Sequence, residues 1–289
     1  MKHIFIVNPI SGQGRAFRMI DNIHRVCQEE KLDYEVIFTR KPHDATDIVK
    51  NYKKGDNVIY SVGGDGTLNE VVNGIVGTKN KLAIIPGGSG NDFYSSLKDI
   101  DEKEFKVDIG KVNDRYFINV VSVGIDAEIG DNALLMKKKR IPRTQIYNAS
   151  IVYTFFKFKF KNIEFKLNNT KMKGQYTMVT IMNGREYGGG YKIAPTADIR
   201  DGLFDIYFID KISKAIIPGL ILKLKKSTHE ESPHVHKRLS NKISFKSEKP
   251  IICGVDGETL YGTKFYIKLL KNKITIYQDK SLIKKILED

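Results

Sequence analysis

The amino-acid sequence predicts a doubly wound α/β domain followed by a mostly antiparallel β-domain. Three observations lead to this prediction. Apolar strand-like runs alternate with helical patterns over the first hundred residues, glycine-rich turns follow several of these strands, and short β-like runs replace the alternation from residue 105 onward. We expect residues 1–105, together with the terminal segment 278–289, to form the first domain and residues 106–277 to form the second.

The first domain is predicted to alternate between strands and helices. The strands are short apolar runs, and the helices carry apolar residues three and four positions apart. The expected strands span residues 3–7, 34–38, 58–62 and 82–85, and the expected helices span about 14–30, 44–52, 67–76 and 91–97. Because ligands of such sheets bind beyond the carboxyl ends of the strands, where the glycine-rich turns lie, we expect one binding site there.

The second domain is predicted to be built from hairpins. Asn113-Asp114 and Asn168-Asn169 are turn pairs that separate β-like runs. The expected strands span residues 106–111, 115–121, 165–167, 176–182, 204–209, 242–245, 251–255, 263–268 and 273–277. The chain should end in a helix that packs on one of the two domains through the apolar stripe Leu282, Ile283, Ile286 and Leu287.

The most informative run is GGDGTLNEVVNG at residues 63–74, which places glycines, acids and amides between a strand and a helix. Glycines in such a turn let backbone N–H groups point at an anion, and the helix N-terminus adds partial positive charge. Asp65 would repel a phosphate unless a magnesium ion bridges the two or the carboxylate positions a proton. The run therefore favours phosphoryl transfer over an ordinary tight turn.

Other familiar site chemistries do not fit the sequence. No Gly-Lys-Ser/Thr sequence completes a P-loop, and Gly12-Gln13-Gly14 lacks the third glycine of a dinucleotide fingerprint. Cys27 and Cys253 provide neither the spacing of a metal site nor a disulfide framework, and we expect two buried, reduced thiols.

The charge of the chain is unevenly distributed. The net charge of +14 lies entirely in residues 107–289, which hold 33 Lys and Arg against 19 Asp and Glu, whereas residues 1–106 hold 15 of each kind. A basic surface attracts nucleic acid, anionic lipid or acidic substrates, or only improves solubility, and charge alone does not choose between these. The sequence contains no membrane-spanning run and no signal-peptide pattern, so we expect a cytoplasmic protein.

Several motifs, taken in order, resemble those of the diacylglycerol kinase catalytic family, and in particular its bacterial soluble lipid kinases. Those of the first half are Asn8-Pro9-x-Ser11-Gly12, the run at residues 63–70, and Pro86-x-Gly88-Ser89-Gly90-Asn91-Asp92-Phe93. Those of the second half are Phe117-x-Asn119-x-x-Ser122-x-Gly124-x-Asp126-Ala127, Asn183-Gly184-x-x-x-Gly188-Gly189-Gly190, Pro195-x-Ala197-x-x-x-Asp201-Gly202-x-x-Asp205 and Asp256-Gly257-Glu258. Ser89 stands where the family more often has threonine, and Gly87 where it has a larger apolar residue.

The resemblance implies an ATP-dependent lipid kinase whose active site lies between an α/β nucleotide-binding domain and a C-terminal β-sandwich domain. It also implies which residues hold ATP. These are Asn8, Pro9, Ile10, Ser11, Gly12, Thr39, Gly63, Gly64, Asp65, Gly66, Thr67, Leu68, Asn69, Glu70 and Ser89.

The resemblance further implies catalytic acids and a structural metal site. Glu258 is similar to the proton acceptor of the family, and Asp65 and Asp256 would share its network with Mg²⁺ and the substrate hydroxyl. A separate Mg²⁺ site resembles the Asp201 side chain with the backbone carbonyls of Asp198 and Leu203. Since Asp256-Gly257-Glu258 alone is also typical of a plain β-turn, this interpretation requires an interdomain cleft that brings it to Asp65.

Two segments combine apolar residues with cations and are candidates for contact with an anionic membrane surface. One is KKKR at residues 137–140 with its apolar neighbours, which is equally a solvated loop. The other is residues 212–226, for which core packing of a helix kinked at Pro218 is at least as good an explanation.

The leading hypothesis is an enzyme, peripherally associated with the inner membrane face, that transfers the γ-phosphoryl group of Mg-ATP to a diacylglycerol-like lipid and so gives a phosphatidate-type product. A kinase for a sphingoid or other long-chain lipid alcohol and an NAD kinase are the alternatives. A nucleic-acid-binding protein is less favoured because no recognised motif accompanies the basic charge. The retained acids argue against an inactive relative, and a homodimer is left open.

Overall fold

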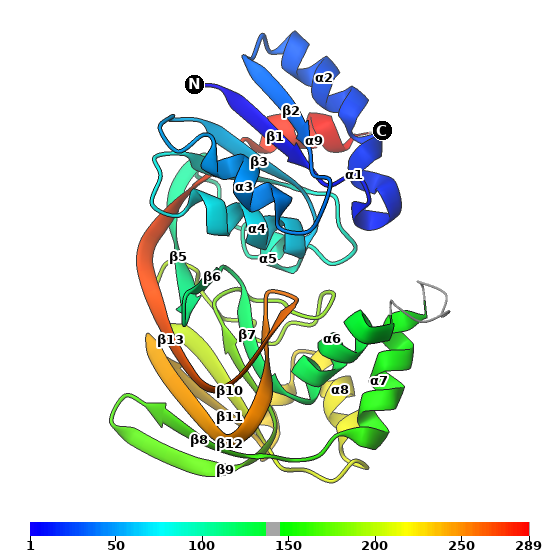
Figure 1. Ribbon diagram of the computed structural model, residues 1–289, viewed down its shortest axis with the longest axis vertical. Coiled ribbons are helices and arrows are strands. Elements are labelled where there is room, and N and C mark those ends of the chain that lie inside the picture. Colours follow the sequence, from blue (N-terminus) through cyan, green and yellow to red (C-terminus); the bar gives the residue numbers. More distant parts are fainter. Residues whose placement is uncertain (137–144, 289) are drawn as a thin grey trace.

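The structure is a computed structural model that describes residues 1–136 and 145–288, and it consists of two lobes (Figure 1). The α/β lobe is built on a parallel sheet in the order β2 (Tyr34–Phe38), β1 (His3–Val7), β3 (Val58–Gly63) and β4 (Lys81–Pro86). All residues of β1 are buried, because helices cover both faces of this sheet. The predicted α/β fold and its strands are confirmed.

The helices of the α/β lobe form two layers. One layer contains α1 (Arg15–Arg18), α2 (Ile20–Glu29) and the last helix, α9 (Lys280–Leu287), whose Leu282 and Ile286 join the core under β1 and β3. The other layer contains α3 (Asp44–Lys50), α4 (Asp65–Ile75) and α5 (Asp92–Ser95). The single helix predicted at residues 14–30 is wrong, since the chain there forms a short 3₁₀ turn and two helices that meet at Met19.

The second lobe is built from antiparallel strands, as predicted. Its hairpins close where expected: Asn113 and Asn168 have positive φ angles of 48° and 52° in two-residue loops, between β5 and β6 and between β8 and β9. Its strands are β5 (Glu104–Val112), β6 (Arg115–Phe117), β7 (Val120–Gly124), β8 (Asn162–Leu167), β9 (Thr170–Met182), β10 (Phe204–Asp210), β11 (Val235–Ser240), β12 (Lys242–Val255) and β13 (Glu258–Tyr277).

Strand β13 connects the two lobes. Its first part pairs with β12 and its middle and end pair with β5, and near its end Ile276 pairs in parallel with Leu82 of β4 (Figure 1). One hydrogen-bonded sheet therefore runs through both lobes, which holds them in a defined relation.

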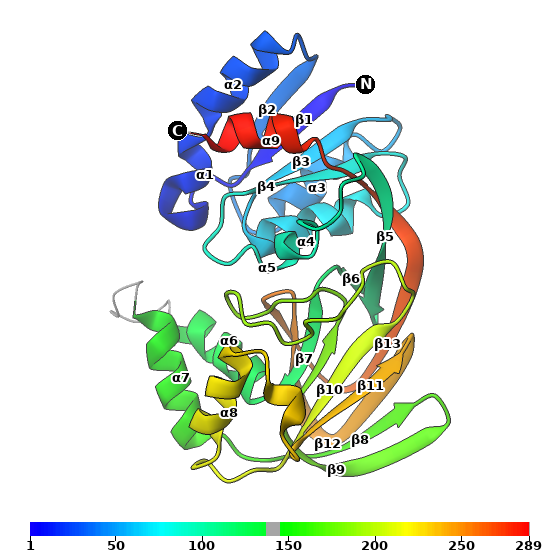
Figure 2. The same cartoon turned by 180° about the vertical axis from the view of Figure 1, so that it is seen from behind.

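Three helices lie together on one side of the β-lobe (Figures 1 and 2): α6 (Ile125–Met136), α7 (Ile146–Lys157) and α8 (Ile217–Lys225). The sequence predicted no helix at α6 or α7. For residues 212–226, the alternative of a helix packed on the core is confirmed at α8, which buries Leu220 and Leu224. The expected kink is wrong, because α8 begins at Ile217 and Pro218 occupies its first turn, where proline is tolerated. The KKKR segment lies outside the described residues. None of the helices that the structure describes combines the length and apolar character needed to span a bilayer.

Candidate active site

The glycine-rich loops after β1, β3 and β4 meet at one edge of the parallel sheet. At Gly12, which has a φ of +56°, an added Cβ would lie 2.2 Å from the carbonyl oxygen of Gly87. At Gly88, it would lie 2.2 Å from the Cα of Gly64. Only glycine permits such close packing of backbone on backbone, so the three loops form one surface. The Asn8 side chain ties the first loop to the second by donating to the Thr67 hydroxyl at 3.1 Å.

The N-terminus of α4 is open at this surface. Its N-cap residue is Gly64, which has no side chain to accept a hydrogen bond from the first N–H groups of the helix. These groups have no partner within the helix, and together with the helix dipole they favour an anion. The loops and α4 therefore fit the phosphates of a nucleotide.

A cavity of about 880 Å³ lies between the lobes and begins at these loops. Its polar end combines the predicted nucleotide residues Ile10, Asp65, Leu68 and Ser89 with Asp92, Asn119, Asp126, Asp256 and Gly257. Its other end reaches between α6 and α7, where the lining is Gly130, Ala133, Leu134 and Ile146. The cavity thus has one end suited to phosphates and another suited to hydrocarbon.

Asp65 occupies the first position of α4 and faces this cavity. Burial and the nearby charge of Asp92 raise the pKa of Asp65 to about 6, and Asp256 adds a smaller effect in the same direction. The backbone N–H of Phe93 opposes this shift only weakly, at 3.4 Å from the carboxylate. A carboxyl group with such a pKa can accept and release a proton near neutral pH.

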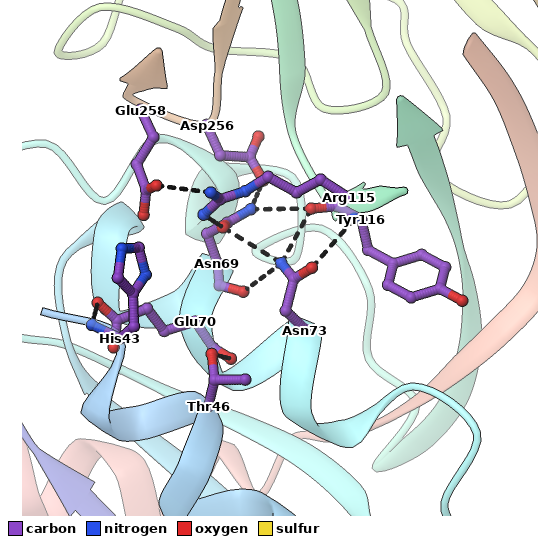
Figure 3. A network of polar contacts seen from close by, with 9 residues as sticks. All are labelled: His43, Thr46, Asn69, Glu70, Asn73, Arg115, Tyr116, Asp256 and Glu258. Carbon is purple, nitrogen blue, oxygen red and sulfur yellow. Dashed lines mark hydrogen bonds and ion pairs between the residues drawn. The ribbon is translucent and has the colours of Figure 1, made fainter. Parts of the chain in front are cut away.

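Asp256 is a buried link between the lobes. Its carboxylate accepts hydrogen bonds from the backbone N–H groups of Ile118, Asn119 and Val120 at 2.8 to 3.0 Å, and from Asn69 Nδ2 of α4 at 2.8 Å (Figure 3). Burial raises the pKa of Asp256, while these donors favour its ionised form. Every oxygen is thus engaged, which fits a positioning role better than proton exchange.

Glu258 follows the cavity-lining Gly257 but is not among the residues that line the cavity. Its Oε2 lies 2.7 Å from Arg115 Nη1, and Arg115 also donates to Asn69 Oδ1 at 2.9 Å (Figure 3). The structure therefore brings Asp65 and Asp256 to one cavity and holds Glu258 in an ion pair beside it.

Asn69 and Glu70, both predicted to hold the nucleotide, are not among the cavity-lining residues and bind other protein groups. Asn69 binds Asp256, and the Glu70 carboxylate accepts the N–H groups of His43 and Ala45 at 2.9 and 3.1 Å, which caps α3. Glu70, His43 and Glu258 have ligand atoms within 4.8 Å of one another. The Glu70 carboxylate already accepts two N–H groups, and the Glu258 carboxylate is paired with the Arg115 guanidinium. This group of residues therefore does not favour a cation.

The predicted structural Mg²⁺ loop lies apart from the cavity lining. Asp201 Oδ1 accepts the N–H of Leu203 at 2.8 Å, and burial together with the charges of Asp198 and Asp205 raises the pKa of Asp201. A hard cation would relieve this repulsion, and one carboxylate with two carbonyls is a donor set that suits Mg²⁺. Asp198, Asp201 and Leu203 thus fit the predicted Mg²⁺ site, and the bound metal stays a prediction.

Asp126 and Asp92 were not among the predicted site residues, although both belong to the family motifs. Among the described residues, neither oxygen of Asp126 accepts a hydrogen bond of normal geometry. Burial raises the pKa of Asp126 to about 6, and the nearby Ser122 hydroxyl and Ala127 N–H offset only part of this effect. Asp92 accepts the N–H groups of Gly189 and Gly190 at 3.0 and 2.8 Å, which joins the lobes a second time. The surroundings of a buried carboxylate depend on contacts between distant segments, so only the motif marked Asp126 in the sequence.

Comparisons with known proteins agree with this architecture. Residues 2–115 match the diacylglycerol kinase catalytic domain, and residues 119–277 match the YegS C-terminal NAD kinase beta sandwich-like domain. The chain is similar to a diacylglycerol kinase of Staphylococcus saprophyticus, at 28% identity over 90% of this chain and 88% of that protein. It is also similar to one of Staphylococcus haemolyticus, at 29% identity over 93% and 84%. Its fold is similar to a crystal structure of a candidate diacylglycerol kinase from Bacillus anthracis, with a TM-score of 0.76 and 24% identity over 97% and 96%.

Replacing Asp256 should destabilise the fold. Asp256→Asn tolerates the positive φ of 45° but turns an amide donor toward backbone donors, so we expect the free energy of unfolding to fall by about 2–4 kcal/mol. Urea denaturation measures this. The matched control Asp114→Asn, whose fully exposed side chain pairs with Lys111, should change little, and an equally small effect at Asp256 would contradict its role as the link.

Replacing Asp65 should stabilise the fold in a pH-dependent way. Because the folded state raises the pKa of Asp65 from 3.8 to about 6, the folded chain binds the proton more tightly than the unfolded chain, and this stabilisation is lost as the pH rises from about 4 to about 6. Asp65→Asn should therefore gain about 1–2 kcal/mol at pH 7, less at pH 5, and nothing below pH 4. Unfolding curves at these pH values test it, and a pH-independent difference would refute the assigned environment.

Proposed function

The chain belongs to the family that joins a diacylglycerol kinase catalytic domain to a YegS C-terminal NAD kinase beta sandwich-like domain, and we propose that it phosphorylates a diacylglycerol-like lipid with ATP. Family membership supports a kinase. The donor, the lipid acceptor and a magnesium requirement are our proposal. The product would be a phosphatidate-type lipid, formed as the lipid hydroxyl oxygen bonds to the γ-phosphorus and the bond to the β-phosphate oxygen breaks, leaving ADP.

One observation carries the proposal: the cavity between the lobes has a polar end and an apolar end. At the polar end, the uncapped N-terminus of α4 and the loops after β1 and β4 would hold the ATP phosphates. At the apolar end, Ala133, Leu134 and Ile146 would contact an acyl chain. A reacting hydroxyl would therefore lie where the two ends meet, beside the carboxylates of the polar end.

The carboxylates divide the remaining tasks. Asp65, with its raised pKa, would accept the hydroxyl proton or hold a magnesium ion, and a bound Mg²⁺ supplies charge neutralisation on the phosphates. Asp126, which accepts no hydrogen bond of normal geometry from the described residues, would accept one from a polar group of the lipid. Glu258 could act as the proton acceptor suggested by the family only if its ion pair with Arg115 opens.

The alternatives make different use of the same cavity. A sphingoid base would place an ammonium group near the Asp126 carboxylate, which favours this base as the second candidate acceptor. An NAD kinase would have no use for the apolar end between α6 and α7. Incubation with γ-labelled ATP and a panel of diacylglycerol, sphingosine and NAD distinguishes these acceptors, and label in NADP would overturn the lipid assignment.

The roles of Asp65 and Glu258 are tested by variants that keep their shape. Asp65→Asn should lower kcat by about 10²–10⁴-fold, because it removes the carboxylate that faces the reacting groups. Glu258→Gln should lower it similarly if Glu258 is the proton acceptor. The matched control is Glu35→Gln, since Glu35 also forms a 2.7 Å ion pair, with Lys2, but lies on β2 away from the cavity. Full lipid kinase activity in a folded Asp65→Asn variant would contradict the role assigned to Asp65.

The lipid end is tested by filling it. Gly130 lies within α6 and lines the cavity, and an added Cβ there meets no atom within 4 Å. Gly130→Leu should therefore fold at least as stably, since leucine favours a helix by up to about 1 kcal/mol over glycine. We expect a higher KM for long-chain diacylglycerol and an unchanged KM for ATP. Unchanged lipid kinetics would mean that the acyl chain binds elsewhere.

A further inference from the structure

Helix α7 buries polar side chains and leaves several apolar ones exposed. Its Ser150 and Thr154 are fully buried, and Thr154 accepts a hydrogen bond from Asn132 of α6 at 2.9 Å. Its Val152, Tyr153 and Phe156 are 57%, 46% and 70% exposed. A helix that only covers a core in water buries its apolar side and exposes its polar side. The outer side of α7 is thus built for contact with something apolar.

The apolar surface continues onto α8. Ile216, just before α8, and Ile221 and Leu222 within it are 41%, 37% and 59% exposed, while Leu220 and Leu224 of the same helix are buried in the core. The two segments are joined because Lys214 Nζ donates to the carbonyl of Phe156 at 3.0 Å. Helices α7 and α8 lie on the same side of the β-lobe (Figures 1 and 2). We call the six exposed side chains of these segments the docking face: Val152, Tyr153, Phe156, Ile216, Ile221 and Leu222.

The two segments that carry the docking face are rich in lysine. Residues 145–161 and 211–226 contain eight lysines and no acidic residue. Among the described residues, only Lys161 of these eight forms an ion pair, with Glu128 at 3.0 Å. The other lysines keep their charge available to a partner, and their long side chains can reach an anionic surface beside the apolar patch.

We propose that the docking face binds the surface of an anionic bilayer. Exposed aliphatic and aromatic side chains beside several lysines suit the interfacial region of such a membrane, where apolar chains meet anionic head groups. A second copy of the chain is a poorer occupant, because a two-fold contact would bring the two sets of lysines together. Leu134 of α6, the helix that packs against α7, is 39% exposed and also lines the apolar end of the cavity, so a membrane bound at α7 would lie near that end. The choice of a bilayer rests on the proposed lipid kinase function.

Vesicle binding tests this proposal. The double variant Phe156→Ser/Leu222→Ser should lose affinity for phosphatidylglycerol-containing vesicles by about tenfold or more, because both apolar contacts are lost. The matched double variant Tyr266→Ser/Leu239→Ser changes side chains of similar exposure, 65% and 51%, on strands away from the face, and should bind like the parent. The parent should also bind pure phosphatidylcholine vesicles more weakly, because these lack the anionic charge.

The outcomes separate this inference from the proposed function. Activity on detergent-dispersed diacylglycerol should be equal in both double variants and the parent, since neither pair lines the cavity. The docking face would be overturned if Phe156→Ser/Leu222→Ser bound vesicles like the parent, or if both double variants lost the same affinity. It would also be overturned if sedimentation showed the parent as a dimer and Phe156→Ser/Leu222→Ser as a monomer. Absence of lipid phosphorylation by the parent would instead overturn the kinase assignment, and the vesicle result would stand.

Discussion

The geometry of the molecule depends on one buried carboxylate. The Asp256 carboxylate accepts hydrogen bonds from three consecutive backbone N–H groups of the β-lobe and from the Asn69 side chain of α4. Helix α4, whose N-terminus lies at the glycine-rich loops, is therefore hydrogen-bonded directly to the β-lobe. A charge that is only 4% exposed persists there because each donor offsets part of its desolvation. Strand β13 and the Asp92 contact to Gly189 and Gly190 support the same arrangement.

This arrangement places groups of opposite character in one cavity at a cost in stability. Asp65 and Asp126 each have a pKa raised to about 6, which means that the fold holds two carboxyl groups where their ionised forms are disfavoured. Groups placed this way are typical of functional sites, where stability is exchanged for reactivity. The apolar end between α6 and α7 lies within the same cavity, so the polar and hydrocarbon parts of one lipid can be bound together.

Much of this could be predicted from the sequence, because local patterns suffice for it. Buried apolar runs predicted the four parallel strands, and the glycine-rich loops were expected at one edge since parallel strands present their carboxyl ends together. Helices α6 and α7 were missed because α7 buries Ser150 and Thr154 and exposes Phe156, which hides the periodicity that marks a helix. The ion pair of Glu258 with Arg115 and the surroundings of Asp126 arise from contacts between distant segments, which no local pattern contains.

The most direct test of the account is a crystal structure with a non-hydrolysable ATP analogue and a short-chain diacylglycerol bound together. We expect the phosphates at the loops after β1, β3 and β4, the lipid hydroxyl beside Asp65, and the acyl chains between α6 and α7. A nucleotide bound away from Asp65, or acyl chains outside the cavity, would contradict the claim that the two lobes hold donor and acceptor in one site.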